Sequence, residues 1–312
     1  MKTAILIFFS ASILFGTTTL YRYYNEDTKA IEEARALDKS ALIKSQVGVT
    51  RYKVFGQENS PVVVLIHSFN GFLESWNPNI SALVNAGYKV IAYDLFGRGL
   101  SDRPRVKYDL SLFRNQLNVV LKELGVDNAH LVGSSFGCVI ASDYSYHYPE
   151  KVDGLIMIGP AGWPDEGGQN PMLNIPILSD LVFHYLGMNI LKPKVEAYFV
   201  EPLKYADTIQ QWSRFASYPG FTRSALSTLK HSPVLDYTSG WEKQERLKTP
   251  TLFIWGKQDV SFSFDNVKKL PKLIPHAKVV GVDNAAHWVN IEQAEVVNTT
   301  IVEFLNTNTL DH

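Results

Sequence analysis

The stretch from Leu131 to Gly137 most constrains the fold, because it joins an apolar run to a helix through a turn that few residues can form. It reads Leu-Val-Gly-Ser-Ser-Phe-Gly and contains the pattern G-x-S-x-G. The apolar run Ala129 to Val132 leads into it, and Cys138 to Ala141 continues it as the start of a helix. In a strand-to-helix turn of this kind, small flanking residues avoid collisions between Cβ atoms. Only Ser135 has glycines two residues before and two residues after it, so Ser135 is the candidate nucleophile.

The net charge and the cysteine content exclude several kinds of site. The 312 residues include 30 Lys and Arg against 31 Asp and Glu, which leaves a formal net charge of -1 and no basic excess for nucleic acid. Cys138 is the single cysteine, so an intramolecular disulfide framework and a multi-cysteine zinc site are both excluded. We expect Cys138 to serve in packing.

An uncharged apolar segment, Thr3 to Tyr21, sets the N-terminus apart. It is about long enough to cross a bilayer as a helix, and the tyrosines that follow are typical of a membrane interface. Residues 1–24 are therefore predicted to be a single-pass membrane anchor, with a cleaved signal peptide and secretion as the alternative. The basic residues on both sides of the segment leave its orientation open. Residues 25–48, charged and alanine-rich, are predicted to be a linker or stalk.

After residue 48, the chain alternates between short apolar runs and amphipathic helical patterns. This alternation predicts an α/β fold with a doubly wound, mostly parallel sheet and helices on both faces. We expect the core in two parts, residues 49–161 and 247–312. Expected strands are 50–55, 62–66, 88–93, 129–132, 154–158, 251–255 and 277–282, and expected helices include 81–86, 110–124 and one near the C-terminus.

Residues 162–246 interrupt this alternation without a strand pattern. The first part is rich in Gly, Pro and Asn, and the remainder combines aromatic residues with helical periodicity. We expect a helical lid that bounds an apolar substrate pocket, and a purely structural subdomain is the alternative.

A serine nucleophile needs a base, and the base needs a carboxylate that orients it. His287 lies between the last expected strand and the terminal helix, after the small residues Ala285 and Ala286. Asp259 follows the strand that ends at Trp255, and Asp283 is the alternative. We therefore predict Ser135, Asp259 and His287 as the catalytic residues.

The oxyanion of an acyl-transfer intermediate requires two backbone N–H donors. One is expected from Phe136, which follows the nucleophile. The second is expected from Phe69, with Ser68 as the less favoured choice, in the loop after the apolar run 62–66.

From residue 49 to residue 305 the chain resembles the α/β-hydrolase superfamily, in its lidded esterase- and lipase-like branch. Three segments and the pair Asp259 and His287 carry the resemblance. The segments are His67-Ser68-Phe69, where the family usually has His-Gly-x, the turn from Asp94 to Pro104, which matches D-x-x-G-x-G-x-S, and the pattern from Gly133 to Gly137. Ser68 departs from the usual glycine and adds a Cβ beside the oxyanion loop.

The resemblance implies a serine hydrolase that needs no metal or organic cofactor. With the expected anchor, it is similar to monoacylglycerol lipase-like and lysophospholipase-like enzymes, which implies a small-molecule or lipid ester substrate and contact with a membrane. A serine at the elbow argues against the haloalkane dehalogenases and epoxide hydrolases of the superfamily, which use aspartate. Carbon–carbon bond hydrolases and cofactor-free perhydrolases remain alternatives, as does a non-catalytic binding or scaffold protein that retains the fold.

Overall fold

The computed structural model describes residues 17–18, 21, 26–164 and 171–308, and an eight-stranded sheet forms its centre. The strand order is β1-β2-β4-β3-β5-β6-β7-β8. The pairs β1–β2 and β2–β4 are antiparallel and the other pairs are parallel, so the predicted mostly parallel sheet is confirmed. The strands are β1 (Ala41–Lys44), β2 (Val49–Phe55), β3 (Val62–Ile66), β4 (Lys89–Tyr93), β5 (Ala129–Ser134), β6 (Val152–Ile158), β7 (Thr251–Gly256) and β8 (Lys278–Val282).

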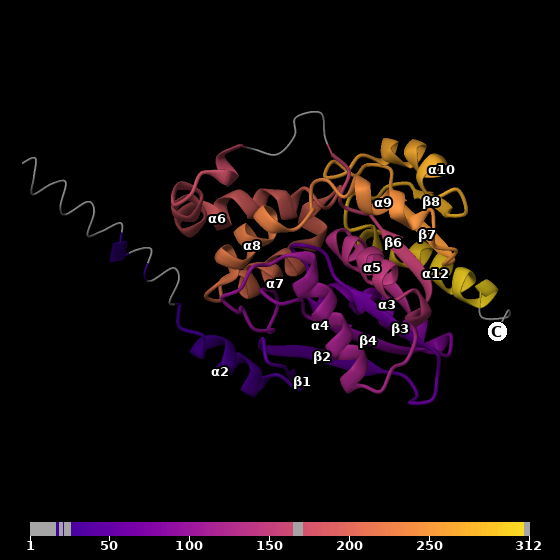
Figure 1. Ribbon diagram of the computed structural model, residues 1–312, viewed down its shortest axis with the longest axis horizontal. Helices are drawn as coiled ribbons and strands as arrows, with labels where there is room; N and C mark the ends of the chain where they lie inside the picture. Colours follow the sequence, from indigo (N-terminus) through magenta and orange to yellow (C-terminus); the bar gives the residue numbers. More distant parts are fainter. Residues whose placement is uncertain (1–16, 19–20, 22–25, 165–170, 309–312) are drawn as a thin grey trace, which may run out of the picture.

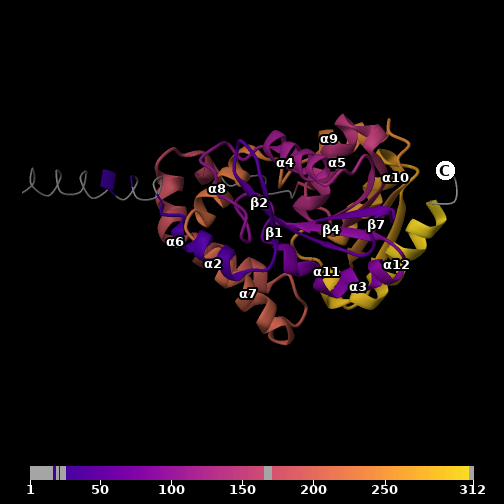
Figure 2. The same cartoon turned by 90° about the horizontal axis from the view of Figure 1, so that it is seen from below.

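Helices cover both faces of the sheet, because each central strand is apolar on both sides. In β3, Val64 and Ile66 belong to one buried cluster, while Val63 and Leu65 belong to the other. Figure 2 shows α4, α5 and α9 on one side of the strands and α3, α11 and α12 on the other. The bounds of these helices are α3 (Asn77–Asn85), α4 (Leu110–Glu123), α5 (Phe136–His147), α9 (Thr238–Gln244), α11 (Val289–Glu292) and α12 (Ala294–Asn308), and α10 (Leu270–Leu273) lies near α9.

The expected linker differs from the structure, because most of residues 25–48 packs on the core. Helix α2 (Lys29–Leu37) buries Ile31, and its Arg35 lies 2.6 Å from the carboxylate of Asp102. Strand β1 extends the sheet beside β2. The folded core therefore begins near Lys29, before the expected residue 49. Charged residues with few local apolar neighbours resemble a linker in sequence, and contacts with distant parts of the chain order them.

The expected membrane anchor lies largely outside the described residues. Within the part of the chain that is described, no helix combines the length and apolar character needed to cross a bilayer.

The insertion between β6 and β7 contains helices joined by turns, and its described part has no strand. Helices α6 (Leu178–Glu196), α7 (Ala206–Ala216) and α8 (Phe221–His231) lie together at one side of the molecule (Figure 1). Helix α9 instead packs against α5, so it belongs to the helical layer of the core although the sequence predicts it within the lid. We use the word lid below for residues 171–231 as described.

Candidate active site

The turn between β5 and α5 presents Ser135 in a strained conformation. Its φ of 52° and ψ of -113° are rarely adopted by a residue with a side chain, and its N–H donates to the carbonyl of Ile158 at 2.8 Å. A Cβ on Gly137 would lie 2.1 Å from the carbonyl oxygen of Ile66, and one on Gly133 would lie 2.5 Å from the backbone of Gly137. Both glycines are therefore required by close backbone approach around the serine.

The structure brings Ser135, His287 and Asp259 together from three separate loops. The distance from His287 Nε2 to Ser135 Oγ is 2.8 Å, and the distance from His287 Nδ1 to Asp259 Oδ2 is also 2.8 Å. All three residues are buried, with exposed fractions of 4%, 1% and 6% in that order. The imidazole can therefore take the serine proton while Asp259 holds the opposite nitrogen in its protonated form.

N–H groups of neighbouring residues hold the carboxylate of Asp259 in the loop after β7. Its Oδ1 accepts from the backbone N–H groups of Ser261 at 2.8 Å and Phe262 at 3.0 Å. Its Oδ2 also accepts from the indole N–H of Trp255 at 3.2 Å. Asp283, the alternative carboxylate, instead pairs with Lys257 at 2.9 Å on the surface.

The loop that carries His287 is fixed by contacts with both the core and the lid. Glu292 accepts from the N–H of Ala286 at 2.6 Å and from the N–H of Val200 in the lid at 2.7 Å. A Cβ on Gly256 would lie 2.2 Å from the carbonyl of Ala286. The missing side chain at Gly256 thus lets the histidine loop cross the end of β7, where Asp259 follows.

The oxyanion loop after β3 is organised by two buried side chains. His67 Nδ1 lies 2.8 Å from the carbonyl of Ser68, and its Nε2 accepts the N–H of Leu95 at 2.9 Å. Arg98, only 2% exposed, donates from Nε to the carbonyl of Phe69 and covers the Phe69 ring at 4.7 Å. The loop is thus held from beneath by the turn that follows β4.

The two predicted oxyanion donors remain available for a ligand. Within the described residues, neither the N–H of Phe69 nor that of Phe136 donates to another protein group. Ser68, the departure from the family pattern, has an ordinary negative φ, and its hydroxyl accepts from the indole of Trp288 at 3.0 Å. The extra Cβ is therefore accommodated without a left-handed backbone.

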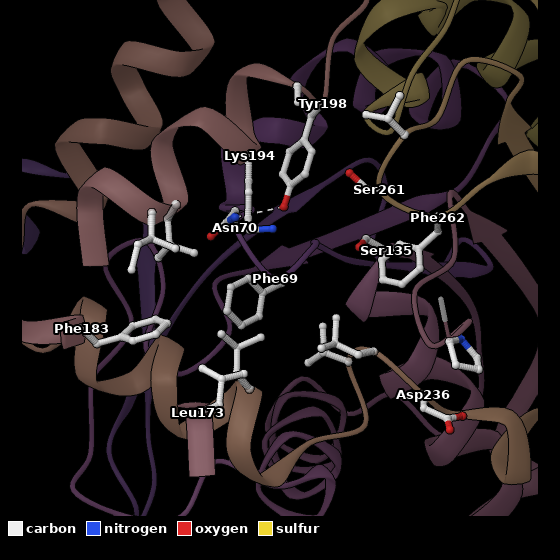
Figure 3. Close-up of a pocket in the computed structure, with 18 of the residues that line it drawn as sticks. Phe69, Asn70, Ser135, Leu173, Phe183, Lys194, Tyr198, Asp236, Ser261 and Phe262 are labelled. Atoms are coloured by element: carbon white, nitrogen blue, oxygen red, sulfur yellow. Dashed lines mark hydrogen bonds between the residues drawn. The ribbon is translucent and has the colours of Figure 1, made fainter. Parts of the chain in front are cut away.

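A cavity of about 810 Å³ opens above Ser135 between the lid and the ends of the strands (Figure 3). Its walls are mostly apolar, and among the described residues only Lys194 and Asp236 bring charge to its lining. In the described part of the chain, no cluster of His, Cys, Asp or Glu could hold a metal ion. Its apolar lining includes Phe69, Phe183, Leu191, Leu229, Leu235 and Phe262.

Three residues around the site are absent from the sequence prediction. Tyr198, at the end of the lid helix α6, places its ring 4.8 Å from that of His287. Asn70 lines the cavity next to Phe69, and Arg98 braces Phe69 from below. Arg98 lies within a recognised turn motif, which could have signalled its role, but no local pattern marks Tyr198.

The fold and this buried Ser–His–Asp arrangement define a hydrolase of the α/β type. Residues 61–294 match the family model of the alpha/beta hydrolase fold, and the chain belongs to that family.

Two curated proteins and one solved structure illustrate what the chain is similar to. The AB hydrolase superfamily protein YfhM of Bacillus subtilis is 25% identical over 266 residues, which cover 80% of this chain and 92% of that protein. The chain is also similar to a 2-hydroxy-6-oxononadienedioate/2-hydroxy-6-oxononatrienedioate hydrolase of Comamonas testosteroni. The two are 27% identical over 253 residues, which cover 78% of this chain and 87% of that protein. A solved structure described as a membrane phospholipase A covers 99% of both chains with a TM-score of 0.68 and 23% identity, which shows a shared fold.

Proposed function

We propose that this protein is a serine hydrolase that cleaves carboxylic esters of acyl lipids, such as monoacylglycerols or lysophospholipids, through an acyl-enzyme on Ser135. One observation carries the proposal. The Ser135 hydroxyl lies 2.8 Å from the buried imidazole of His287 and lines a mostly apolar cavity of about 810 Å³. A cavity of this size and character suits an acyl chain.

The geometry supports a two-step acyl transfer. Ser135 Oγ attacks the ester carbonyl while His287 Nε2 takes the hydroxyl proton, and the N–H groups of Phe69 and Phe136 receive the negative oxygen. His287 then returns the proton to the leaving alcohol, and the C–O bond of the ester breaks. Water, deprotonated by the same nitrogen, hydrolyses the acyl-enzyme and releases the acid. Asp259 stabilises the imidazolium in both steps.

The outer surface of the lid supports a membrane-bound substrate. Large apolar side chains are exposed at Ile175, Ile177, Leu178, Tyr185 and Leu186, which we call the lid edge. Leu178 also lines the cavity, so this apolar surface continues into the site. We propose that residues 1–24 attach the enzyme to a bilayer and that the lid edge faces the lipid.

Near the lid, Glu26 marks where the chain leaves the N-terminal segment. Its carboxylate lies 3.2 Å from Arg223 of α8, and its carbonyl accepts from Arg105 at 3.4 Å. The start of the folded domain is thereby held against a lid helix.

Substitution of Ser135 tests the chemistry. We expect a fluorophosphonate probe to label the wild-type protein and Ser135→Ala to abolish both labelling and hydrolysis of monoacylglycerols and lysophospholipids. Ser134→Ala is the matched control, because the neighbouring Ser134 Oγ is buried and, within the described residues, has no hydrogen-bond partner. Labelling that persists in Ser135→Ala would refute the assignment.

A second candidate function is hydrolysis of a carbon–carbon bond in a vinylogous diketone acid. The similarity to hydrolases of 2-hydroxy-6-oxo-dienoates, at 27–29% identity, favours it. Such substrates are anionic, whereas among the described residues only Lys194 adds a cation to the cavity lining, and that side chain is exposed. Turnover of a 2-hydroxy-6-oxo-6-phenylhexa-2,4-dienoate without turnover of acyl esters would select this function over ester hydrolysis.

A further inference from the structure

Asn70 and Tyr198 form a hydrogen-bonded polar pair in the lining of the mostly apolar cavity. Asn70 Nδ2 donates to the Tyr198 hydroxyl at 3.0 Å, and the two residues lie 128 positions apart in the chain. Both line the same cavity as Ser135, and Figure 3 shows the pair facing the open space beside that serine. Asn70 is 1% exposed and Tyr198 is 8% exposed, so the protein alone shields them from bulk water.

The pair leaves hydrogen-bonding capacity unused. Asn70 Oδ1 is buried, and no described residue donates to it. The Tyr198 hydroxyl accepts from Asn70, but no described group accepts its proton. If the amide were turned over, Tyr198 would donate to Asn70 and the amide N–H would be unused instead, so one donor and one acceptor remain in either orientation.

The phenol remains a neutral donor across the physiological range. Burial raises the pKa of Tyr198 to about 12. Its ring is held in place between the lid and the histidine loop, because the carbonyl of Tyr198 accepts the N–H of Trp288 at 3.1 Å and the ring packs 5.3 Å from that of Trp288. The hydroxyl is therefore fixed in direction and available to a ligand.

We propose that the Asn70–Tyr198 pair binds a hydroxyl group of the substrate's alcohol portion, and that it selects polyol esters over simple alkyl esters. A hydroxyl is the group that donates one hydrogen bond and accepts another at the same atom, which matches the unused pair. A carboxylate or phosphate would only accept and would leave the acceptor unsatisfied in a buried site. An alkyl group would leave both atoms unsatisfied.

This inference rests on the proposed ester hydrolysis and names the substrate class as acyl esters of glycerol-like alcohols. A site built to bind a hydroxyl discriminates against an otherwise equal ligand that lacks it, because its buried polar groups then stay unpaired.

Two esters of one fatty acid test the pair. Glyceryl monolaurate and propyl laurate share the acyl chain and the three-carbon alcohol and differ by two hydroxyl groups. We expect the full-length wild-type enzyme to have the higher kcat/KM with the glyceryl ester, and Tyr198→Phe to reduce the ratio of the two kcat/KM values by about fivefold to tenfold, as expected for a hydrogen bond between neutral groups. The phenylalanine keeps the ring against His287, so the ratio separates hydroxyl recognition from packing.

Tyr205→Phe is the matched control, because Tyr205 is also a lid tyrosine but its hydroxyl faces the carbonyl of Glu292 at 3.5 Å and does not line the cavity. We expect this variant to keep the wild-type ratio. An unchanged ratio in Tyr198→Phe would overturn the inference, including the case in which kcat/KM falls by the same factor with both esters. If neither ester is hydrolysed and the fluorophosphonate probe leaves Ser135 unlabelled, the proposed function itself fails, which is a distinct result.

Discussion

At the scale of single residues, His67 illustrates how burial determines the state of an ionisable group. Burial lowers the pKa of His67 to about 4, against 6.5 for the free side chain, and the nearby charge of Asp94 only partly opposes this. The ring nitrogens meet a carbonyl and a backbone N–H, a pattern that only a neutral imidazole can satisfy. The 3.9 Å approach of His67 to Asp94 is therefore no ion pair at neutral pH.

His67 should make the protein less stable in mild acid. Between pH 6.5 and about 4 the unfolded chain binds a proton at His67 that the folded protein does not, so stability is fully present above pH 6.5 and falls toward pH 4. The loss attributable to this residue should reach about 3 kcal/mol at one pKa unit per 1.36 kcal/mol. The free energy of unfolding, measured with urea between pH 7.5 and pH 4, should fall less steeply with decreasing pH in His67→Gln than in the wild-type protein. The same pH dependence in the two proteins would contradict the assignment.

Arg98 shows a different use of a buried charge. Burial lowers its pKa to about 9, and its hydrogen bonds go to the carbonyls of Phe69 and Gly97 and to the Ser224 hydroxyl. Ser224 lies on the lid helix α8, so one guanidinium joins the oxyanion loop to the lid. Arg98 is thus a positioning residue for the proposed oxyanion donor.

At the scale of elements, Gly137 and Gly125 are constrained for two distinct reasons. Gly137 lies where α5 touches the end of β3, and a side chain there would collide with backbone that cannot move aside. Gly125 ends α4 with a φ of +63° but has open space around it. One position is constrained by contact and the other by backbone conformation.

Alanine substitutions should separate these two constraints. Gly137→Ala should lower the free energy of unfolding by about 1–3 kcal/mol, as overpacking does, and should reduce esterase activity because β3 leads into the oxyanion loop. Gly125→Ala should cost about 1 kcal/mol through its left-handed backbone and leave activity intact. Denaturant unfolding and ester turnover measure both effects. Equal activity in the two variants would contradict the role given to the contact.

At the scale of the whole molecule, the lid edge should determine access to substrate in a bilayer. Leu186 is half exposed and does not line the cavity. In full-length protein reconstituted into vesicles, Leu186→Ser should lower turnover of bilayer lipid several-fold relative to turnover of a soluble short-chain ester. Val296→Ser, on α12 in the opposite part of the molecule, is the control with a similar exposed fraction.

An independent optical measurement checks the same surface without depending on activity. Cys138 is buried, so a fluorophore will attach selectively to a cysteine introduced by Leu186→Cys or Val296→Cys. Emission from position 186 should shift to the blue in vesicles and emission from position 296 should not. The same spectrum at both positions would refute contact between the lid edge and lipid.

Much of the fold could be predicted from local patterns. Runs such as Val62 to Ile66 are apolar on both faces, which is the signature of a central parallel strand. The meeting of Ser135, Asp259 and His287 could be predicted in the same way, because each residue lies in the loop that follows a strand and parallel strands end at one edge of a sheet. The packing of α2 and β1 on the core could not be predicted, because it depends on partners outside these elements. Arg35 of α2 pairs with Asp102, and Asp38, between α2 and β1, pairs with Arg51 of β2.

The sequence by itself determined every strand except β1 and the glycine-lined turn, since each depends on backbone constraints within a few positions. It also marked the loops after strands that carry Ser135, Asp259 and His287. Only the tertiary structure decided the shape of the cavity and the pairing of Asn70 with Tyr198. These depend on how a lid without strand signals folds back over the sheet, and that packing joins side chains more than a hundred residues apart. Local propensity carries no record of such contacts, because the free energy that forms them comes from burial in the assembled molecule.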